Sequence, residues 1–218
     1  MSGITLLDRV NSDITMDEQS SMAFRVTTTN PDGTPMDLTN GTVTWVADFN
    51  NNQQIKKDMP TLTVMLDAVP ATTVASTAAA GSYVITVAQI SGFSDPWGRQ
   101  VANFAAGMIV NIVSLGGNSE VNTIQSINNM QLTMSNPLVY TYSNGDAVAE
   151  IITSFTFQLL PGDTILPATK SYGTDIIYYH MAQVTYPAGL SPGNIYSVPT
   201  TEIVLRGRMF INPVLNIS

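Results

Sequence analysis

The sequence predicts an all-β fold in which both ends of the chain form a β-sandwich that is interrupted by a small inserted β-module. Two observations favour strands throughout: apolar residues recur at every second position, and the apolar runs are bounded by Gly, Pro, Asn and Asp. A third observation, a shift toward small residues with few aromatics, indicates the insertion. We therefore expect residues 1–59 and 150–218 to form the sandwich, and residues 60–149 to form a small barrel or sheet.

Two strands are predicted in the N-terminal part. Met22, Phe24 and Val26 alternate with less apolar residues, and the same alternation returns over 43–49. Successive side chains of a strand point to opposite faces, so both runs are typical of half-buried antiparallel strands. Residues 30–41 contain Asn-Pro-Asp-Gly-Thr-Pro, and we expect a connection there because Pro presets φ and Gly accepts positive φ.

Three further strands are predicted near the C-terminus, over 155–159, 176–185 and 202–211. In the last of them we expect one apolar face, made of Ile203, Leu205, Met209 and Ile211.

The middle of the chain is predicted to hold short strands joined by tight turns. The expected strands are 107–113, 121–127, 130–134 and 147–151. Asn128-Asn129 and Asn144-Gly145 lie where tight hairpins need left-handed residues. Residues 87–106 are the one place where a short helix could lie, although Pro and two Gly in this segment disfavour a helix.

Composition excludes several classes of function. The 218 residues include 8 Lys and Arg against 16 Asp and Glu, a formal charge of −8, which argues against binding nucleic acid or an anionic membrane. The longest uncharged run, 68–94, is too polar to cross a bilayer. The N-terminus lacks the basic head and long apolar core of a secretory signal, so we expect none.

Chemistry at a metal or cofactor is not expected either. There is no cysteine, and the single histidine, His180, cannot supply the imidazoles of a usual zinc enzyme. The sequence contains none of the motifs GxSxG, GxxxxGK[ST], GxGxxG, CxxC or the EF-hand loop. We therefore predict that the protein is not an enzyme and holds no cofactor.

An acidic stretch near the N-terminus has two interpretations. The residues concerned are Asp8, Asp13, Asp17 and Glu18. They could bind a divalent cation, but they lack the alternating ligand spacing and the Gly of a calcium loop. A solvated surface is the favoured interpretation.

Two residues are expected in the protein interior. Trp45 is predicted to fill the space between two sheets, as a large aromatic on a central strand commonly does. His180 lies on a predicted strand and shares a face with Tyr178 and Ala182, which favours a packed or interfacial histidine over a catalytic base.

Three residues are candidates for contacts with a partner. Trp97, in a loop with Pro and Gly, is either a piece of local core or an exposed anchor, and the sequence leaves both open. Arg206 and Arg208 flank Gly207 and share a strand face, where they either form interchain pairs with carboxylates or are solvated charges.

Segments at both ends of the chain resemble one known domain. Residues 24–46, Phe-Arg-Val-Thr-Thr-Thr-Asn-Pro-Asp-Gly-Thr-Pro-Met-Asp-Leu-Thr-Asn-Gly-Thr-Val-Thr-Trp-Val, resemble the opening of the immunoglobulin-like N-terminal domain of tailed-phage baseplate upper proteins. Residues 155–164, 177–184 and 204–213 resemble the closing half of that domain, with its Pro-x-Asp-Thr turn and Tyr-rich strand. The middle, over 107–138, is similar to β-modules of phage virion proteins.

This resemblance implies an immunoglobulin-like sandwich and a structural role. The protein would be a component of a tailed-phage virion, in the tail or baseplate, assembled in the host cytoplasm and binding other virion proteins and copies of itself. One alternative is a capsid decoration or neck protein of the same virion. Another, from a different class, is a carbohydrate-binding module that stacks a host-surface glycan on exposed aromatics. The aromatics named for that alternative are Trp97, Tyr140, Tyr142 and Tyr172.

Overall fold

The computed structural model describes residues 4–8, 12–49, 53–59, 64–95, 98–164, 176–188 and 199–212. Apart from one 3-10 turn, the regular structure in these ranges is all β, which confirms the predicted class. The chain divides into two compact units: one is made of residues 1–67 and 153–218, the other of residues 68–152. The sequence placed these boundaries at 59/60 and 149/150. In the structure the boundaries lie at 67/68 and 152/153. The first lies later than predicted because Val64–Leu66 pairs with a strand of the first unit.

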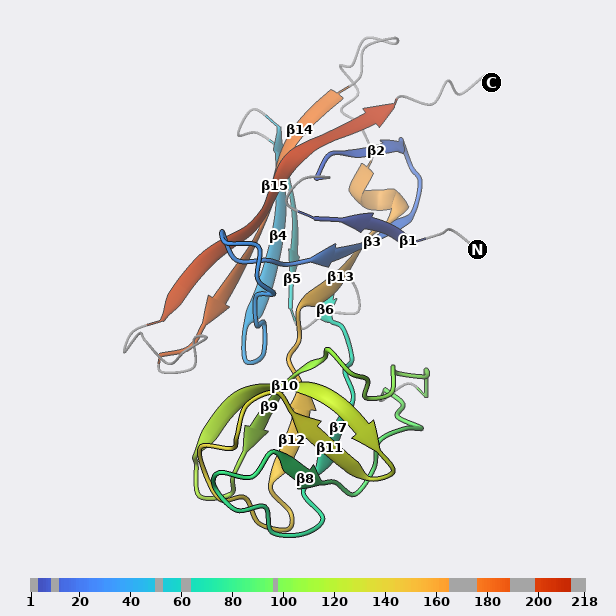
Figure 1. Cartoon of the computed structure of the whole chain (residues 1–218). Helices are drawn as coiled ribbons and strands as arrows, with labels where there is room; N and C mark the ends of the chain where they lie inside the picture. The colour runs from blue at the N-terminus through green and yellow to red at the C-terminus, as the bar shows by residue number, and fades with distance from the viewer. Residues whose placement is uncertain are drawn as a thin grey trace. The chain divides into compact units, whose positions relative to one another are not determined.

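The first unit contains a four-stranded sheet in the order β1-β3-β13-β6 (Figure 1). Its strands are β1 (Ile4–Leu7), β3 (Met22–Thr27), β13 (Ser154–Leu159) and β6 (Val64–Leu66). β1 runs parallel to β3, and the other two pairings are antiparallel. Strands from both ends of the sequence therefore share one ladder, because β3 and β13 pair over their whole length.

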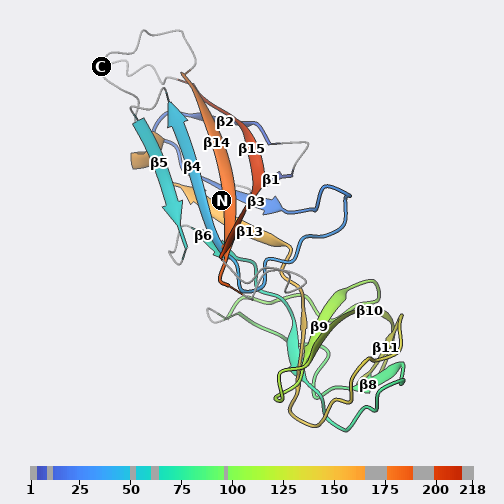
Figure 2. The same ribbon diagram turned by 90° about the vertical axis from the view of Figure 1, so that its left-hand side faces the viewer.

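The same unit contains a five-stranded sheet in the order β2-β15-β14-β4-β5 (Figure 2). Its strands are β2 (Ile14–Asp17), β15 (Thr200–Asn212), β14 (Ile176–Tyr186), β4 (Thr42–Phe49) and β5 (Gln53–Asp58). β2 runs parallel to β15, and the remaining pairs are antiparallel.

Aromatic stacking joins the two sheets into a sandwich. The Trp45 ring, on β4, stacks on Phe157 of β13 with 4.7 Å between ring centroids, and Phe157 stacks in turn on Phe24 of β3 at 5.0 Å. All three side chains are fully buried. The predicted position of Trp45 between two sheets is therefore confirmed, since offset-stacked rings fill such an interface densely.

The connection predicted over 30–41 is confirmed. The N–H of Asn30 donates to the carbonyl of Thr34 at 2.8 Å, and Gly33 has a φ of 85°. Leu38 inserts fully into the core, and the hydroxyl of Tyr186 donates to the carbonyl of Asp37 at 2.7 Å. The connection is therefore anchored to the sandwich at its second half.

One predicted face of β15 is wrong at a single position. Leu205, Met209 and Ile211 are buried as expected, but Ile203 is 37% exposed. The register with β14 shifts between Ala182 and Gln183, so that Leu205 pairs with Ala182 while Ile203 pairs with Gln183. A bulge inserts an extra residue and moves the side chains beyond it to the opposite face.

A short 3-10 turn, η1 (Pro161–Thr164), follows β13. Its Asp163 forms an ion pair with Lys57 of the edge strand β5, with 2.6 Å between Nζ and Oδ2. Lys57 pairs with Trp45 across the ladder and so points inward. A charge that points inward from an edge strand discourages pairing with another chain.

The second unit is a six-stranded barrel in the order β7-β12-β9-β10-β11-β8. Its strands are β7 (Ala71–Thr73), β8 (Val84–Thr86), β9 (Ile109–Val113), β10 (Ser119–Asn128), β11 (Gln131–Met134) and β12 (Ala147–Glu150). An antiparallel bridge between Val74 and Val87 joins the two ends of this order. The N–H of Ala75 donates to Thr86 and the N–H of Ala88 donates to Thr73, both at 2.8 Å, so the ring of strands is closed.

The interior of the barrel is apolar and packed. Its largest fully buried side chains are Tyr142, Ile85, Ile112, Ile124, Leu132 and Met134. β10 pairs with β9 through residues 119–123 and with β11 through residues 124–128, with a register shift between Ile124 and Ser126. One strand thus bends round the core and serves two neighbours, as barrel closure requires.

The short helix for which 87–106 left room is absent from the residues described there, which adopt bends, turns and two isolated bridges, Val87 with Val74 and Ser94 with Gln100. Positive φ angles at Gly92 and Gly98 are incompatible with a regular helix, which explains the difference.

Candidate functional site

The sequence-predicted contact residues fall into two groups. Arg206 and Arg208 are both exposed on β15, on the outer face of the five-stranded sheet, as predicted. Trp97 lies outside the described residues.

Arg208 is held in place by a carboxylate of its own chain. Its Nη2 and Nε donate to Oδ2 of Asp13 at 2.7 and 3.2 Å, and its backbone N–H donates to Oδ1 at 2.8 Å. These hydrogen bonds from Arg208 hold the pKa of the Asp13 carboxyl below its usual range. The guanidinium also lies 5.3 Å from the centroid of the Phe210 ring, within range of a cation–π contact.

An apolar column lies beside the two arginines. Ile177, Tyr179 and Met181 of β14 are exposed on the outer face, and Tyr179 is 70% exposed. Their neighbours Tyr178 and His180 are buried on the inner face. Sequence reasoning missed this column, although the alternation around His180 carried the signal.

The ladder sets this column between charged residues. Tyr179 pairs with Arg208 on one side and with Asp48 of β4 on the other. Met181 pairs in the same way with Arg206 and Val46. We call the surface formed by Ile177, Tyr179, Met181, Arg206, Arg208 and Asp48 the outer sheet face.

Asp48 has an unsatisfied acceptor. Its Oδ1 is buried and has no hydrogen-bond partner among the described residues. A buried oxygen without a donor costs free energy, so Asp48 is a strained position in this sheet face.

On the inner face of the same strands, both ring nitrogens of His180 are engaged in hydrogen bonds. Its Nε2 donates to the carbonyl of Ser12 at 2.7 Å, and its Nδ1 accepts from the indole N–H of Trp45 at 3.2 Å. Burial lowers the pKa of His180 despite the opposing effects of Ser12 and Asp13. The prediction of a packed histidine is confirmed.

The aromatics named for glycan stacking are not gathered in one place that the structure describes. Tyr142 is fully buried in the barrel core, where burial raises the pKa of its phenol, so its expected exposure is wrong. Tyr140 is partly exposed. Trp97 and Tyr172 lie outside the described residues.

The acidic stretch near the N-terminus is engaged in polar contacts. Asp13 binds Arg208, and a carboxylate oxygen of Asp17 accepts from the side chain of Asn212 at 3.3 Å. Within the described ranges, no three His, Cys, Asp or Glu side chains are arranged to hold a metal ion.

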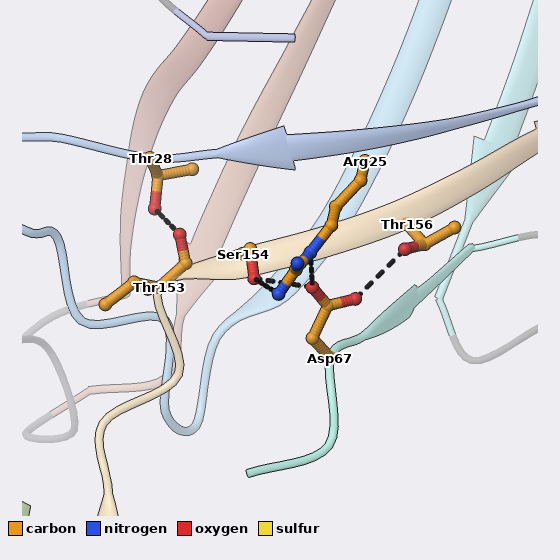
Figure 3. A network of polar contacts seen from close by, with 6 residues as sticks. All are labelled: Arg25, Thr28, Asp67, Thr153, Ser154 and Thr156. Atoms are coloured by element: carbon orange, nitrogen blue, oxygen red, sulfur yellow. Dashed lines mark hydrogen bonds and ion pairs between the residues drawn. The ribbon is translucent and has the colours of Figure 1, made fainter. Parts of the chain in front are cut away.

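A polar cluster centred on Asp67 marks the place where the chain leaves the sandwich (Figure 3). The Asp67 carboxylate accepts hydrogen bonds from Arg25 at 2.5 Å, from Ser154 at 2.5 Å and from Thr156 at 3.0 Å. Nearby, the hydroxyl of Thr28 donates to the carbonyl of Thr153 at 2.8 Å. The departing and returning segments are therefore fastened to the same sheet.

The barrel carries very few charges. Residues 68–152 include only Asp95, Arg99, Glu120, Asp146 and Glu150. Asp95 and Arg99 form an ion pair, and Glu120 and Asp146 each accept two backbone N–H groups. Glu150 also has a polar partner. These charges are thus used within the unit.

Apolar side chains replace charges on the barrel surface. The exposed large hydrophobic residues of this unit are Tyr83, Val84, Val113, Leu115, Val121, Met130, Val139 and Tyr140. Leu115 is 86% exposed. The cores of interfaces between proteins are depleted in charge and enriched in aromatic residues and Met, so this surface, with Tyr83, Tyr140 and Met130, is a second candidate for protein contacts.

No helix in the described part of the chain is long and apolar enough to cross a membrane. No protein-family model matches the chain, and no curated protein sequence matches it.

Proposed function

We propose that this chain is a structural component of a tailed-phage virion, placed in the tail or baseplate, and that it acts through contacts with other virion proteins and with copies of itself. The assignment to a virion rests on the resemblance of residues 24–46, 155–164, 177–184 and 204–213 to an immunoglobulin-like domain of baseplate proteins. A sandwich built by strands from both ends of the chain is compatible with that domain.

The observation that carries the proposal is the surface chemistry of the barrel. Its charges are used internally, while eight large hydrophobic side chains are exposed. Net surface charge keeps the molecules of a free protein apart and so keeps it soluble. Exposed apolar area, in contrast, promotes association. A surface of this kind fits a protein whose faces are covered in an assembly.

The proposed role is structural, and the chain is expected to catalyse no reaction. Among the described residues, His180 is occupied by Trp45 and Ser12 and therefore offers no free base. The polar cluster at Asp67 is an interlocked set of hydrogen bonds that fastens strands.

The test is to locate the chain in purified particles. Mass spectrometry of phage particles from a host that carries this gene should detect the chain in a fixed ratio to the major tail protein, and antibody-gold labelling should fall on the tail end. Labelling of the shell or neck would favour the capsid decoration or neck alternative. Absence from particles would overturn the proposal.

A further inference from the structure

We propose that the outer sheet face is a two-fold interface between two copies of this chain, with Tyr179 at the axis and Arg208 of each copy opposite Asp48 of the other. This inference deepens the proposed function by naming the partner of one surface, and it rests on that function only in taking the chain to act by protein contacts.

The first step is the row of side chains across the sheet. Arg208, Tyr179 and Asp48 are paired side by side on three adjacent strands, with Tyr179 on the central one. All three point to the outer face, since Tyr178 and His180 on either side of Tyr179 point inward. A cation, an aromatic ring and an anion therefore stand in one line.

The second step is symmetry. In an isologous contact, residue i of one copy meets residue j of the other, and j meets i. Suppose that the two-fold axis runs parallel to β14. Then β15 of each copy faces β4 of the other copy. Arg208 then lies opposite Asp48 twice, and Tyr179 lies opposite Tyr179.

The third step is that both partners of this pair have capacity left. The guanidinium of Arg208 carries five N–H donors, and Asp13 engages only Nε and Nη2. Asp48 is partly exposed, and no donor among the described residues bonds its Oδ1. A second copy would meet Asp48 on its exposed side. Asp13 thus acts as a positioning residue that aims Arg208 without saturating it.

The fourth step is the mixture of charges on this side of the sheet. Arg206, Arg208 and Lys56 lie there among the acidic residues Asp13, Asp17 and Asp48, whereas the whole chain carries −8. Like charges repel across an interface, so two copies of an acidic chain are expected to meet through a face that carries both signs of charge.

The apolar column supplies the remaining contact. Ile177, Tyr179 and Met181 form a strip along the proposed axis, and each is exposed. Two sheets that pack face to face lie about 10 Å apart with strands rotated by roughly 30°. One layer of interdigitated side chains from each copy fills this spacing. The long side chain of Arg208 can still reach the other copy when the strands are rotated.

The experiment uses the full chain and two charge reversals. Sedimentation equilibrium should show the wild type as a dimer at high concentration. Asp48→Lys alone and Arg208→Glu alone should each be monomeric, with the dissociation constant raised by at least about tenfold. A one-to-one mixture of the two variants should associate again, because both cross-pairs are then of opposite charge.

A matched pair of lysine variants checks the axis independently of these charges. Tyr179→Lys should abolish dimerisation, whereas Leu6→Lys, at a residue that is 69% exposed on β1 of the other sheet, should leave it unchanged. Circular dichroism and thermal unfolding of each variant establish that it is folded. If Asp48→Lys fails to fold, the Tyr179→Lys comparison still decides the question.

The outcomes that overturn the inference are distinct from those that overturn the proposed function. A monomeric wild type at millimolar concentration would contradict the two-fold interface, as would a dimer indifferent to Tyr179→Lys or a mixture that fails to associate. None of these results bears on whether the chain is found in virions, which the particle experiment measures separately.

Discussion

The indole N–H of Trp45 donates to Nδ1 of His180 across 3.2 Å, inside the sandwich. Since Nδ1 accepts, the proton of the neutral ring sits on Nε2, which donates to the Ser12 carbonyl at 2.7 Å. A protonated ring would place two N–H groups against each other at Trp45. This relationship makes the fold sensitive to pH at one residue.

Stability should therefore fall as the pH is lowered through the range in which an ordinary histidine titrates. Burial lowers the pKa of His180 in the folded chain below 6.5, so the unfolded chain binds the proton more readily. Protonation therefore stabilises the unfolded chain relative to the folded one. The loss begins below about pH 6.5 and cannot exceed about 1.4 kcal/mol per pH unit for one proton. Urea unfolding at pH 7.5, 6.5 and 5.5, roughly spanning the titration of histidine, measures it.

His180→Gln is the matched control for this pH dependence. A glutamine can donate to the Ser12 carbonyl and accept from the Trp45 indole, but it does not titrate. Its unfolding free energy should be flat over the same range. An equal slope in this variant would show that another group is responsible.

Trp45→Ala should destabilise the sandwich by about 3–5 kcal/mol, because it leaves a cavity between the two sheets and removes the ring that stacks on Phe157. Trp45→Phe keeps much of that volume, but it leaves Nδ1 of His180 without a donor and should cost about 1–3 kcal/mol. Chemical denaturation of both variants gives the order. A loss below about 1 kcal/mol for the alanine variant would contradict the inter-sheet position.

Gly207→Ala should be strongly destabilising, while Gly162→Ala should not. A Cβ at Gly207 would overlap the Ser12 carbonyl, which is backbone and cannot simply rotate away, and would crowd Nε2 of His180 at 2.8 Å. At Gly162 nothing lies within 4 Å of the added atom. The melting temperatures of the two variants test this contrast, and similar values would contradict it.

Asp67→Ala should cost more stability than Arg25→Met. The carboxylate of Asp67 is mostly buried and accepts from Arg25, Ser154 and Thr156, so its removal leaves several donors without a partner. Leaving buried groups unpaired costs about 1–3 kcal/mol, whereas a partly exposed ion pair contributes about 0–1 kcal/mol. Thermal unfolding ranks the variants, and the reverse order would show that the ion pair dominates.

Replacing residues 68–152 by a short Gly/Ser linker should leave a folded sandwich. The N–H of Asp67 donates to the carbonyl of Ser154 at 3.1 Å, so the two cut ends lie side by side and closing them costs little entropy. Near-ultraviolet circular dichroism and a cooperative melt are the measurements. A chain without a cooperative transition would show that the sandwich depends on the barrel.

The sequence predicted the strands that carry a clear alternation, and it failed where non-local pairing decides. Phe24, Trp45 and Phe157 lie in the core because one face of each strand was apolar. Ile203 was misplaced because a bulge has no local signal in the sequence. The three-residue strands β7 and β8 were not predicted at all, since such short strands exist only because neighbouring strands complete the ladder.

The candidate site was partly predictable for the same reason. Arg206 and Arg208 share a face by alternation alone. The partner of Arg208 is Asp13, 195 residues away in sequence, and no spacing rule could have selected it among the sixteen acidic residues. Asp48 stands beside Tyr179 only because β4 is the neighbour of β14.

The closing bridge between Val74 and Val87 gives each barrel strand a neighbour on both sides. Edge strands with free backbone groups are the usual template for unwanted fibril growth, and the bridge covers the edges that β7 and β8 would otherwise present. Many copies of so weakly charged a module can then be crowded together without polymerising through their backbones. The choice of binding partner then depends on the surface side chains of the module. Single substitutions can change that choice without altering the strands.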